Sequence, residues 1–277
     1  MAYSAEISRR NPTAFLFVID QSGSMNDRWQ VGLTKAKAAS DALNRLLNDL
    51  IVQCSKAEGI RRYFDVGVIG YKGTQPYDAL GFIPGPLLKP IGDLDSQPLR
   101  IEDRDVKIPD GAGSFIVQSA KFPVWFEAVA DGGTPMAEAL EMAAHEIGSW
   151  CDTHRSAYPP TVLHITDAEV NAADPEPVAD VLRQLSTDDG NVLLLNMHIS
   201  GTGGARVIFP NSEAELPDDL AQRLFRMSSP MPDLLLGAAQ SCGYNVVPGA
   251  RGYGYNALFE DLVSFFRIGT QPANLAR

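Results

Sequence analysis

Five oxygen-bearing side chains of the kind that binds hard metal ions lie in three short segments of the sequence. In residues 20–24 (DQSGS), two hydroxyls stand two residues apart, and Gly23 permits a turn tight enough for both to face one point. Mg²⁺ is octahedral, binds oxygen, and usually keeps water while taking only one or two carboxylates. The pattern therefore predicts a Mg²⁺ site, with Mn²⁺ and Ca²⁺ as alternatives. Its predicted ligands are Asp20, Ser22, Ser24, Thr134 and Asp167.

Both carboxylates of this set follow apolar runs that are typical of buried strands. Residues 14–20 (AFLFVID) are apolar up to the final Asp, and residues 161–166 (TVLHIT) directly precede Asp167. Two further runs, residues 63–71 (YFDVGVIGY) and 192–199 (VLLLNMHI), have the same character. Runs of this length and composition indicate strands that are buried on both faces, as in a parallel sheet.

Segments with helical periodicity alternate with these strands. Apolar stripes within residues 43–51 and 136–147 predict two amphipathic helices, and shorter helices are expected at 177–185, 234–240 and 256–266. The alternation predicts an α/β fold with a doubly wound, mostly parallel central sheet flanked by helices. In such sheets ligands gather at the carboxyl ends of the strands, where the predicted metal ligands also fall.

The region of residues 81–130 has a different composition. It carries six prolines, several glycines and only short apolar pieces, which predicts an irregular insertion with one or two β-hairpins. The sequence as a whole is interpreted as one domain at 13–268 that contains this insertion, with tails at 1–12 and 269–277.

Each candidate ligand also has an ordinary structural explanation. Ser24 is a suitable cap for the first helix, and Thr134 followed by Pro135 fits an N-cap with proline at the first helical position. Asp167 taken alone resembles a loop carboxylate. The neighbouring acids Asp131 and Glu169 are interpreted as exposed loop residues, with tuning of the site's charge or binding of a second ion as alternatives. The occurrence of all five donors at one predicted edge favours the metal interpretation.

At these positions the chain resembles the von Willebrand factor type A (VWA) family. The metal ion-dependent adhesion site (MIDAS) of that family has the pattern Asp-x-Ser-x-Ser, then a distant Thr, then a distant Asp. Residues 20–24 match the first part, and Thr134 and Asp167 match the others, so that the resemblance covers about residues 12–268. Two departures are Ala168, where many members have Gly, and the long insertion.

The resemblance implies a non-enzymatic interaction module. Ser22, Ser24 and Thr134 would be hydroxyl ligands, and Asp20 and Asp167 would bind directly or through water. The remaining position would accept an Asp or Glu carboxylate of a protein partner. The chain also resembles stand-alone bacterial cytoplasmic members in size, and this resemblance implies a partner such as a kinase, phosphatase or ATPase in a stress-response system.

Two other functions remain as alternatives. A Mg²⁺-dependent phosphoester hydrolase would use Asp20 as nucleophile, but haloacid dehalogenase-type enzymes have Asp-x-Asp, and Ser22 stands where their acid–base carboxylate would be. The ending Gly-Lys-Ser/Thr of a P-loop is also missing from this segment. The second alternative is a scaffold in which the metal stabilises the fold.

Composition limits the class of partner. The 277 residues carry a net charge of −11 with no basic cluster, which argues against nucleic-acid binding.

The three cysteines are far apart and form neither a disulfide framework nor a zinc pattern, and His164 and His198 are expected to be core residues. Since no apolar stretch suits a signal peptide or a membrane span, the sequence predicts a soluble, cytoplasmic protein without membrane contact.

Overall fold

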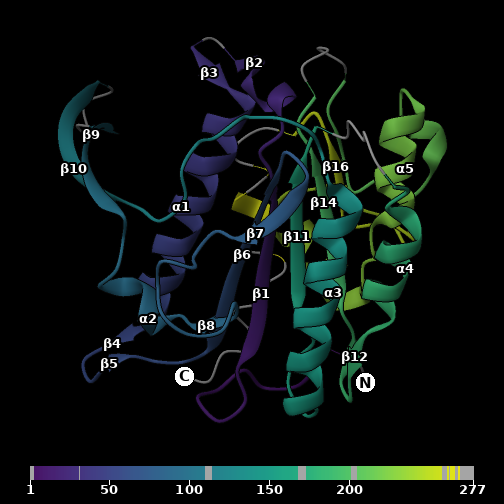
Figure 1. The fold of residues 1–277 in the computed structure, drawn as a ribbon, viewed down its shortest axis with the longest axis horizontal. Coiled ribbons are helices and arrows are strands. Elements are labelled where there is room, and N and C mark those ends of the chain that lie inside the picture. Colours follow the sequence, from purple (N-terminus) through teal and green to yellow (C-terminus); the bar gives the residue numbers. More distant parts are fainter. Residues whose placement is uncertain are drawn as a thin grey trace.

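A central sheet organises the chain (Figure 1). The computed structural model describes residues 3–30, 32–109, 114–167, 173–200 and 205–257, together with residues 261, 263–265 and 268. The strand order is β15-β16-β14-β11-β1-β6-β7, and β8 also pairs with β6. These strands are β1 (Thr13–Asp20), β6 (Phe64–Lys72), β7 (Gln75–Asp78), β8 (Lys89–Pro90), β11 (Thr161–Thr166), β14 (Leu193–His198), β15 (Val207–Ile208) and β16 (Tyr253–Tyr255).

The interior of the sheet is parallel and its margins are antiparallel. β6, β1, β11, β14 and β16 run in one direction, whereas β7, β8 and β15 pair in the opposite sense. The predicted α/β class with a mostly parallel sheet is therefore confirmed. The four apolar runs of the sequence are the four central strands, because only fully buried strands need apolar residues on both faces.

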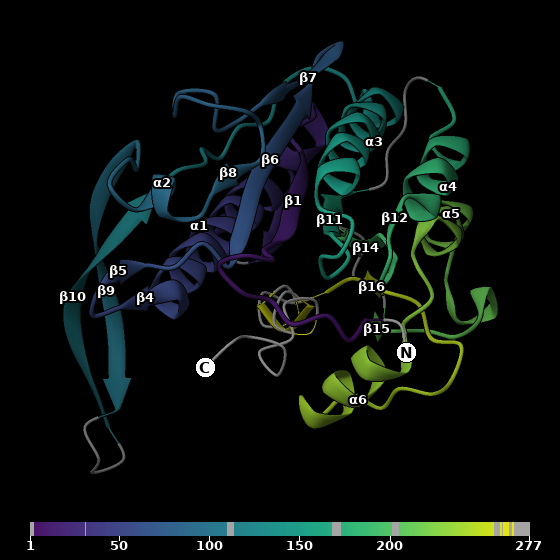
Figure 2. The same cartoon turned by 90° about the horizontal axis from the view of Figure 1, so that it is seen from below.

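Alternate residues of β1 enter two separate cores. Phe15, Phe17 and Ile19 pack in one hydrophobic cluster with residues of α1 (Lys35–Cys54) and α6 (Asp233–Ser241). Ala14, Leu16 and Val18 pack in the other cluster. That second cluster includes residues of α3 (Met136–Thr153), α4 (Glu176–Gln184) and α5 (Asp219–Met227). Figure 2 shows α1 and α3 on opposite sides of the sheet.

The insertion is built around one long β-hairpin, as predicted. After the short helix α2 (Gly92–Asp95), β9 (Arg100–Pro109) pairs with β10 (Phe115–Val124) and projects from the rest of the molecule (Figures 1 and 2). Near the base of the hairpin, Arg104 Nη1 lies 2.9 Å from Asp41 Oδ1 of α1. Directly after β10, the backbone N–H groups of Trp125 and Phe126 donate hydrogen bonds to the buried Asn44 Oδ1 atom.

Several small elements are not evident in the sequence. Two that matter for the fold are α5, whose apolar residues Ala221, Leu224 and Phe225 are buried, and β16. Of the predicted helix at 256–266, residues 261 and 263–265 are helical, and residues 258–260, 262 and 266 lie outside the described residues. None of the described helices is long and apolar enough to cross a membrane. The remaining elements are β2 (Arg28–Gln30), β3 (Leu33–Thr34), β4 (Ser55–Lys56), β5 (Gly59–Ile60), β12 (Ser186–Thr187), β13 (Gly190–Asn191), η1 (Gly23–Asn26) and η2 (Glu213–Glu215).

A chain of buried polar side chains crosses the second core. Tyr71 Oη lies 2.8 Å from His164 Nε2, and His164 Nδ1 lies 2.8 Å from Asn196 Oδ1. Asn196 Nδ2 donates to Ser228 Oγ at 2.9 Å. Since the Asn196 oxygen only accepts, His164 carries its proton on Nδ1 and Tyr71 donates to Nε2. The prediction that His164 and His198 are core histidines is confirmed, since both are buried and hydrogen-bonded.

These histidines should make the fold acid-sensitive. Burial lowers the pKa of His164 and of His198 from 6.5 to about 4. Over the pH range between these two pKa values, the histidines therefore bind more protons in the unfolded chain than in the folded chain. The free energy of unfolding consequently decreases as the pH falls from about 6.5 towards 4. The expected loss is on the order of 3 kcal/mol for each histidine. Urea unfolding at pH 7, 5.5 and 4.5 measures it.

A pair of glutamine variants separates this effect from general acid denaturation. His164→Gln should flatten the pH dependence of the unfolding free energy, whereas His145→Gln, at a side chain on α3 that is 78% exposed, should not. An unchanged slope in His164→Gln would contradict the assignment.

Candidate metal centre

The two carboxylates of the predicted site lie at the carboxyl edge of the parallel sheet. Asp20 is the last residue of β1, and Asp167 follows Thr166, the last residue of β11. Because β1 and β11 are parallel neighbours, both side chains emerge at the same edge. Both are buried, with exposures of 0% for Asp20 and 6% for Asp167.

The loop after β1 brings two hydroxyls together. The backbone N–H of Ser22 donates to Asp20 Oδ1 at 2.8 Å, which closes a tight turn at the end of the strand. The hydroxyl oxygens of Ser22 and Ser24 then lie 3.1 Å apart. Ser22 is buried and Ser24 is half-buried, so that this pair leads from the interior towards the surface.

The loop that carries Thr134 is joined to this first loop through the backbone. Gly23 N–H donates to the carbonyl of Gly132 at 2.9 Å, and Asp131 N–H donates to the carbonyl of Gln21 at 2.8 Å. Gly132 has a φ of 69°, and a Cβ there would lie 2.8 Å from the Cα of Gly73. This close approach requires glycine at position 132, two residues before the buried Thr134.

Two buried oxygens of the predicted ligand set have no hydrogen-bond partner among the residues that the structure describes. They are Thr134 Oγ1 and Asp167 Oδ1. A buried polar atom without a partner costs free energy, so native proteins rarely retain one without a reason. A Mg²⁺ ion is the kind of group that such atoms would hold, because it prefers hydroxyl, carboxylate and water oxygens. The donor set therefore fits the ion that the sequence predicts.

The structure does not place Thr134 or Ser24 as helix caps. The cap of α3 is Pro135, without any side-chain hydrogen bond, so Thr134 does not cap that helix. Ser24 lies within η1, and α1 is capped instead by Thr34, whose side chain accepts the Lys37 N–H. Asp167 is buried rather than an exposed loop acid.

Burial and charge both act on the Asp20 carboxylate. Burial raises the pKa of Asp20 from 3.8 to about 6, and the charge of Asp167 adds to the rise, while hydrogen bonds from Ser22 and Thr166 lower it. The Thr166 hydroxyl donates to Asp20 Oδ2 at 2.7 Å. Lys35 Nζ lies 2.9 Å from Asp167 Oδ2 and 3.6 Å from Asp27 Oδ2.

Lys35 and Thr166 are members of the site that sequence reasoning missed. Lys35 falls on the apolar stripe of α1, four residues before Ala39 and eight before Leu43, and a lysine on such a stripe is a signal for a buried charge partner.

Of the neighbouring acids, Asp131 is exposed, as expected. Ala168 and Glu169 lie outside the described residues. Within the described part of the chain, no group of three or more His, Cys, Asp or Glu residues is placed to hold a metal.

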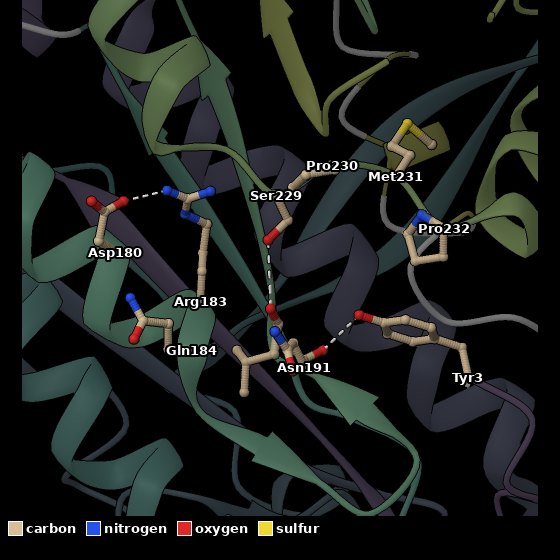
Figure 3. Close-up of a pocket in the computed structure, with 10 residues that line it drawn as sticks. Tyr3, Asp180, Arg183, Gln184, Asn191, Ser229, Pro230, Met231 and Pro232 are labelled. Atoms are coloured by element: carbon tan, nitrogen blue, oxygen red, sulfur yellow. Dashed lines mark hydrogen bonds and ion pairs between the residues drawn. The ribbon is translucent and has the colours of Figure 1, made fainter. Parts of the chain in front are cut away.

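A separate pocket lies at the amino ends of the parallel strands, opposite the candidate metal centre. It has a volume of about 440 Å³, and Asn191 and Val192 on its wall directly precede β14, at the amino end of that strand. Figure 3 shows Tyr3 donating to the Asn191 carbonyl and Asp180 paired with Arg183. The pocket is thus distinct from the candidate metal centre.

Comparison with known proteins shows distant similarity of fold only. No family model matches the chain, and no curated protein matches it. Among solved structures, the chain is similar to the vWF domain of the type V pilus tip protein Mfa5 of Porphyromonas gingivalis (TM-score 0.34, 13% identity, 60% of this chain and 43% of that one). It is also similar to the pilus adhesin SpaC of Lactobacillus rhamnosus GG (0.45, 12%, 98% and 31%). A third is the minor pilin PilB of Streptococcus sanguinis (0.45, 12%, 95% and 61%). The chain spans less than two thirds of each of these proteins, and similarities this distant indicate neither a function nor a partner.

Proposed function

We propose that this chain is a non-enzymatic, divalent-metal-dependent protein-interaction module. Asp20, Ser22, Ser24, Thr134 and Asp167 would hold Mg²⁺, and a partner's Asp or Glu carboxylate would complete the coordination. The observation that carries the proposal is the pair of orphaned buried oxygens, Thr134 Oγ1 and Asp167 Oδ1, at the edge where Ser22 and Ser24 converge.

The composition of the donor set explains why a carboxylate would be the preferred ligand. Three of the five donors are neutral hydroxyls, and Asp167 already shares its charge with Lys35. An ion held in this way would keep much of its positive charge and attract an anionic oxygen strongly. Ser24, the most exposed of the five donors, marks the side from which a partner would approach.

Hydrolysis of a phosphoester is the weaker candidate. Position 22 is a serine, which cannot act as the carboxylic acid that such a mechanism needs. The structural-metal alternative predicts that partner binding survives removal of the metal.

The class of partner follows from the VWA resemblance of the motif. That resemblance favours a bacterial, cytoplasmic, stress-response or signalling system in which the partner is a kinase, phosphatase or ATPase. A net charge of −11 makes nucleic acid a poor partner.

The first test is calorimetric titration of Mg²⁺ and Mn²⁺ into metal-stripped protein. Wild type should bind one ion, and Asp20→Ala should lose binding, because the variant removes one of only two carboxylates in the donor set. Asp131→Ala, at an exposed acid in the adjoining loop, is the matched control and should bind as wild type does.

A second test addresses the carboxylate. Random peptides displayed on phage are selected on the wild-type protein in Mg²⁺ and then eluted with EDTA. The selected peptides should share an Asp or Glu, and they should not bind Asp20→Ala. Selection of peptides without an acid, or of peptides that EDTA leaves bound, would count against the interaction function even if the metal binds.

A further inference from the structure

Lys35 is a buried cation beside the candidate metal centre. It is the first residue of α1 and is only 5% exposed. Its ammonium group lies 2.9 Å from Asp167 Oδ2, and both side chains of this pair are buried, with exposures of 6% and 2%. The second neighbour, Asp27 Oδ2 at 3.6 Å, belongs to a side chain that is 69% exposed.

The stability of α1 does not explain this lysine. The amino end of a helix carries partial positive charge, which disfavours a cation in the first turn. Burial of an ammonium group is also costly unless a negative charge compensates for it. The compensating charge is Asp167, and the position of Lys35 is therefore explained by that carboxylate rather than by the helix.

Asp167 divides its two oxygens between different roles. Oδ2 accepts the Lys35 ammonium, whereas Oδ1 is buried without a partner in the described part of the chain. Asp20, the other carboxylate of the site, is fully buried and uses both oxygens for hydrogen bonds. Lys35 thus offsets part of the negative charge that these two carboxylates concentrate at the sheet edge.

We propose that Lys35 is a tethered cation that sets the metal affinity of the site. In the metal-free protein, Lys35 neutralises Asp167 and so lets the ligand loops assemble. When metal binds, Lys35 shares Asp167 with the ion and repels the ion. The consequence is a site that stays folded without metal but binds Mg²⁺ more weakly than the same ligands would alone. This inference rests on the proposed function, because it assumes that Asp167 is a ligand.

The test uses two matched lysine variants on one helix. Lys35→Met keeps the length of the side chain and removes its charge, and Lys37→Met does the same to the half-exposed lysine that pairs with Asp41. Lys35→Met should unfold at lower temperature than wild type without metal, since Asp167 is left uncompensated. It should nevertheless bind Mg²⁺ about tenfold more tightly, because a like charge has been removed next to the ion. Lys37→Met should match wild type in both measurements.

The two readouts separate this inference from the proposed function. If wild type binds Mg²⁺ and Lys35→Met binds it equally or more weakly, the tethered-cation role is wrong while the metal site stands. If neither wild type nor Lys35→Met binds any divalent ion, both proposals fail. Should Lys35→Met not fold, Lys35→Gln retains a polar group at the same position, and its Mg²⁺ affinity must again exceed that of wild type.

Discussion

Replacement of Thr134 by valine should abolish high-affinity Mg²⁺ binding and yet leave the metal-free protein at least as stable as wild type. Valine has nearly the volume and shape of threonine but lacks the hydroxyl. The Thr134 Oγ1 atom is buried and has no hydrogen-bond partner within the described ranges, so its removal relieves an unsatisfied polar group. The expected gain in unfolding free energy without metal is about 1 kcal/mol.

The loss of metal affinity in Thr134→Val should be large. Changes to groups that merely support metal ligands typically weaken binding by about 10–100-fold, and the loss of a ligand should reach at least the upper end of that range. Calorimetry with Mg²⁺ measures the affinity, and thermal unfolding in EDTA measures the stability.

Thr161→Val is a matched control for this prediction. Thr161 is also buried, and its hydroxyl has no partner among the described residues, but it begins β11 at the end of the strand remote from Asp167. This variant should gain stability as Thr134→Val does and keep the wild-type Mg²⁺ affinity. If Thr134→Val binds Mg²⁺ as wild type does, Thr134 is not a ligand, and the orphaned hydroxyl has some other cause.

Replacement of Asn196 by leucine should destabilise the fold by roughly 3 kcal/mol, because it breaks a buried hydrogen-bond chain at its centre. Asn196 is fully buried and connects His164 on β11 to Ser228 beyond α5. Leucine can neither accept the His164 Nδ1–H nor donate to Ser228 Oγ, so both buried groups lose a partner. Urea unfolding at pH 7.5 measures the difference.

Asn245→Leu serves as the control for this variant, since Asn245 is exposed and its replacement should change stability by no more than about 0.5 kcal/mol. A loss below about 1 kcal/mol in Asn196→Leu would mean that the core repacks around leucine and that the polar chain contributes little.

The predicted effects of the two substitutions differ because the two polar groups differ. Thr134 carries a hydroxyl that nothing in the described chain satisfies, which is expected of a side chain reserved for a ligand. Asn196 uses its oxygen and its nitrogen within the core, which is expected of a structural residue. The comparison of the two variants therefore distinguishes function from stability by the sign of the effect on the metal-free protein.

Much of the fold was determined by the sequence. Residues 14–20, 63–71, 161–166 and 192–199 are almost uninterrupted apolar runs, and such runs have few structural alternatives to a strand buried on both faces. The apolar stripes within residues 43–51 and 136–147 likewise predicted the helices α1 and α3. The short strands at the margins, such as β15 and β16, were not predictable, because pairing of two or three residues depends on the neighbouring strand rather than on their own composition.

For the candidate site, the sequence determined the types and order of the donors, because Asp20, Ser22, Ser24, Thr134 and Asp167 stand at recognisable strand ends and loops. Only the tertiary structure decided which of them keep an oxygen free. Thr134 forms no cap although its sequence context suits one, and Lys35, far away in the chain, takes one oxygen of Asp167. The pairing of Lys35 with Asp167 joins residues 132 positions apart, which local sequence patterns do not encode.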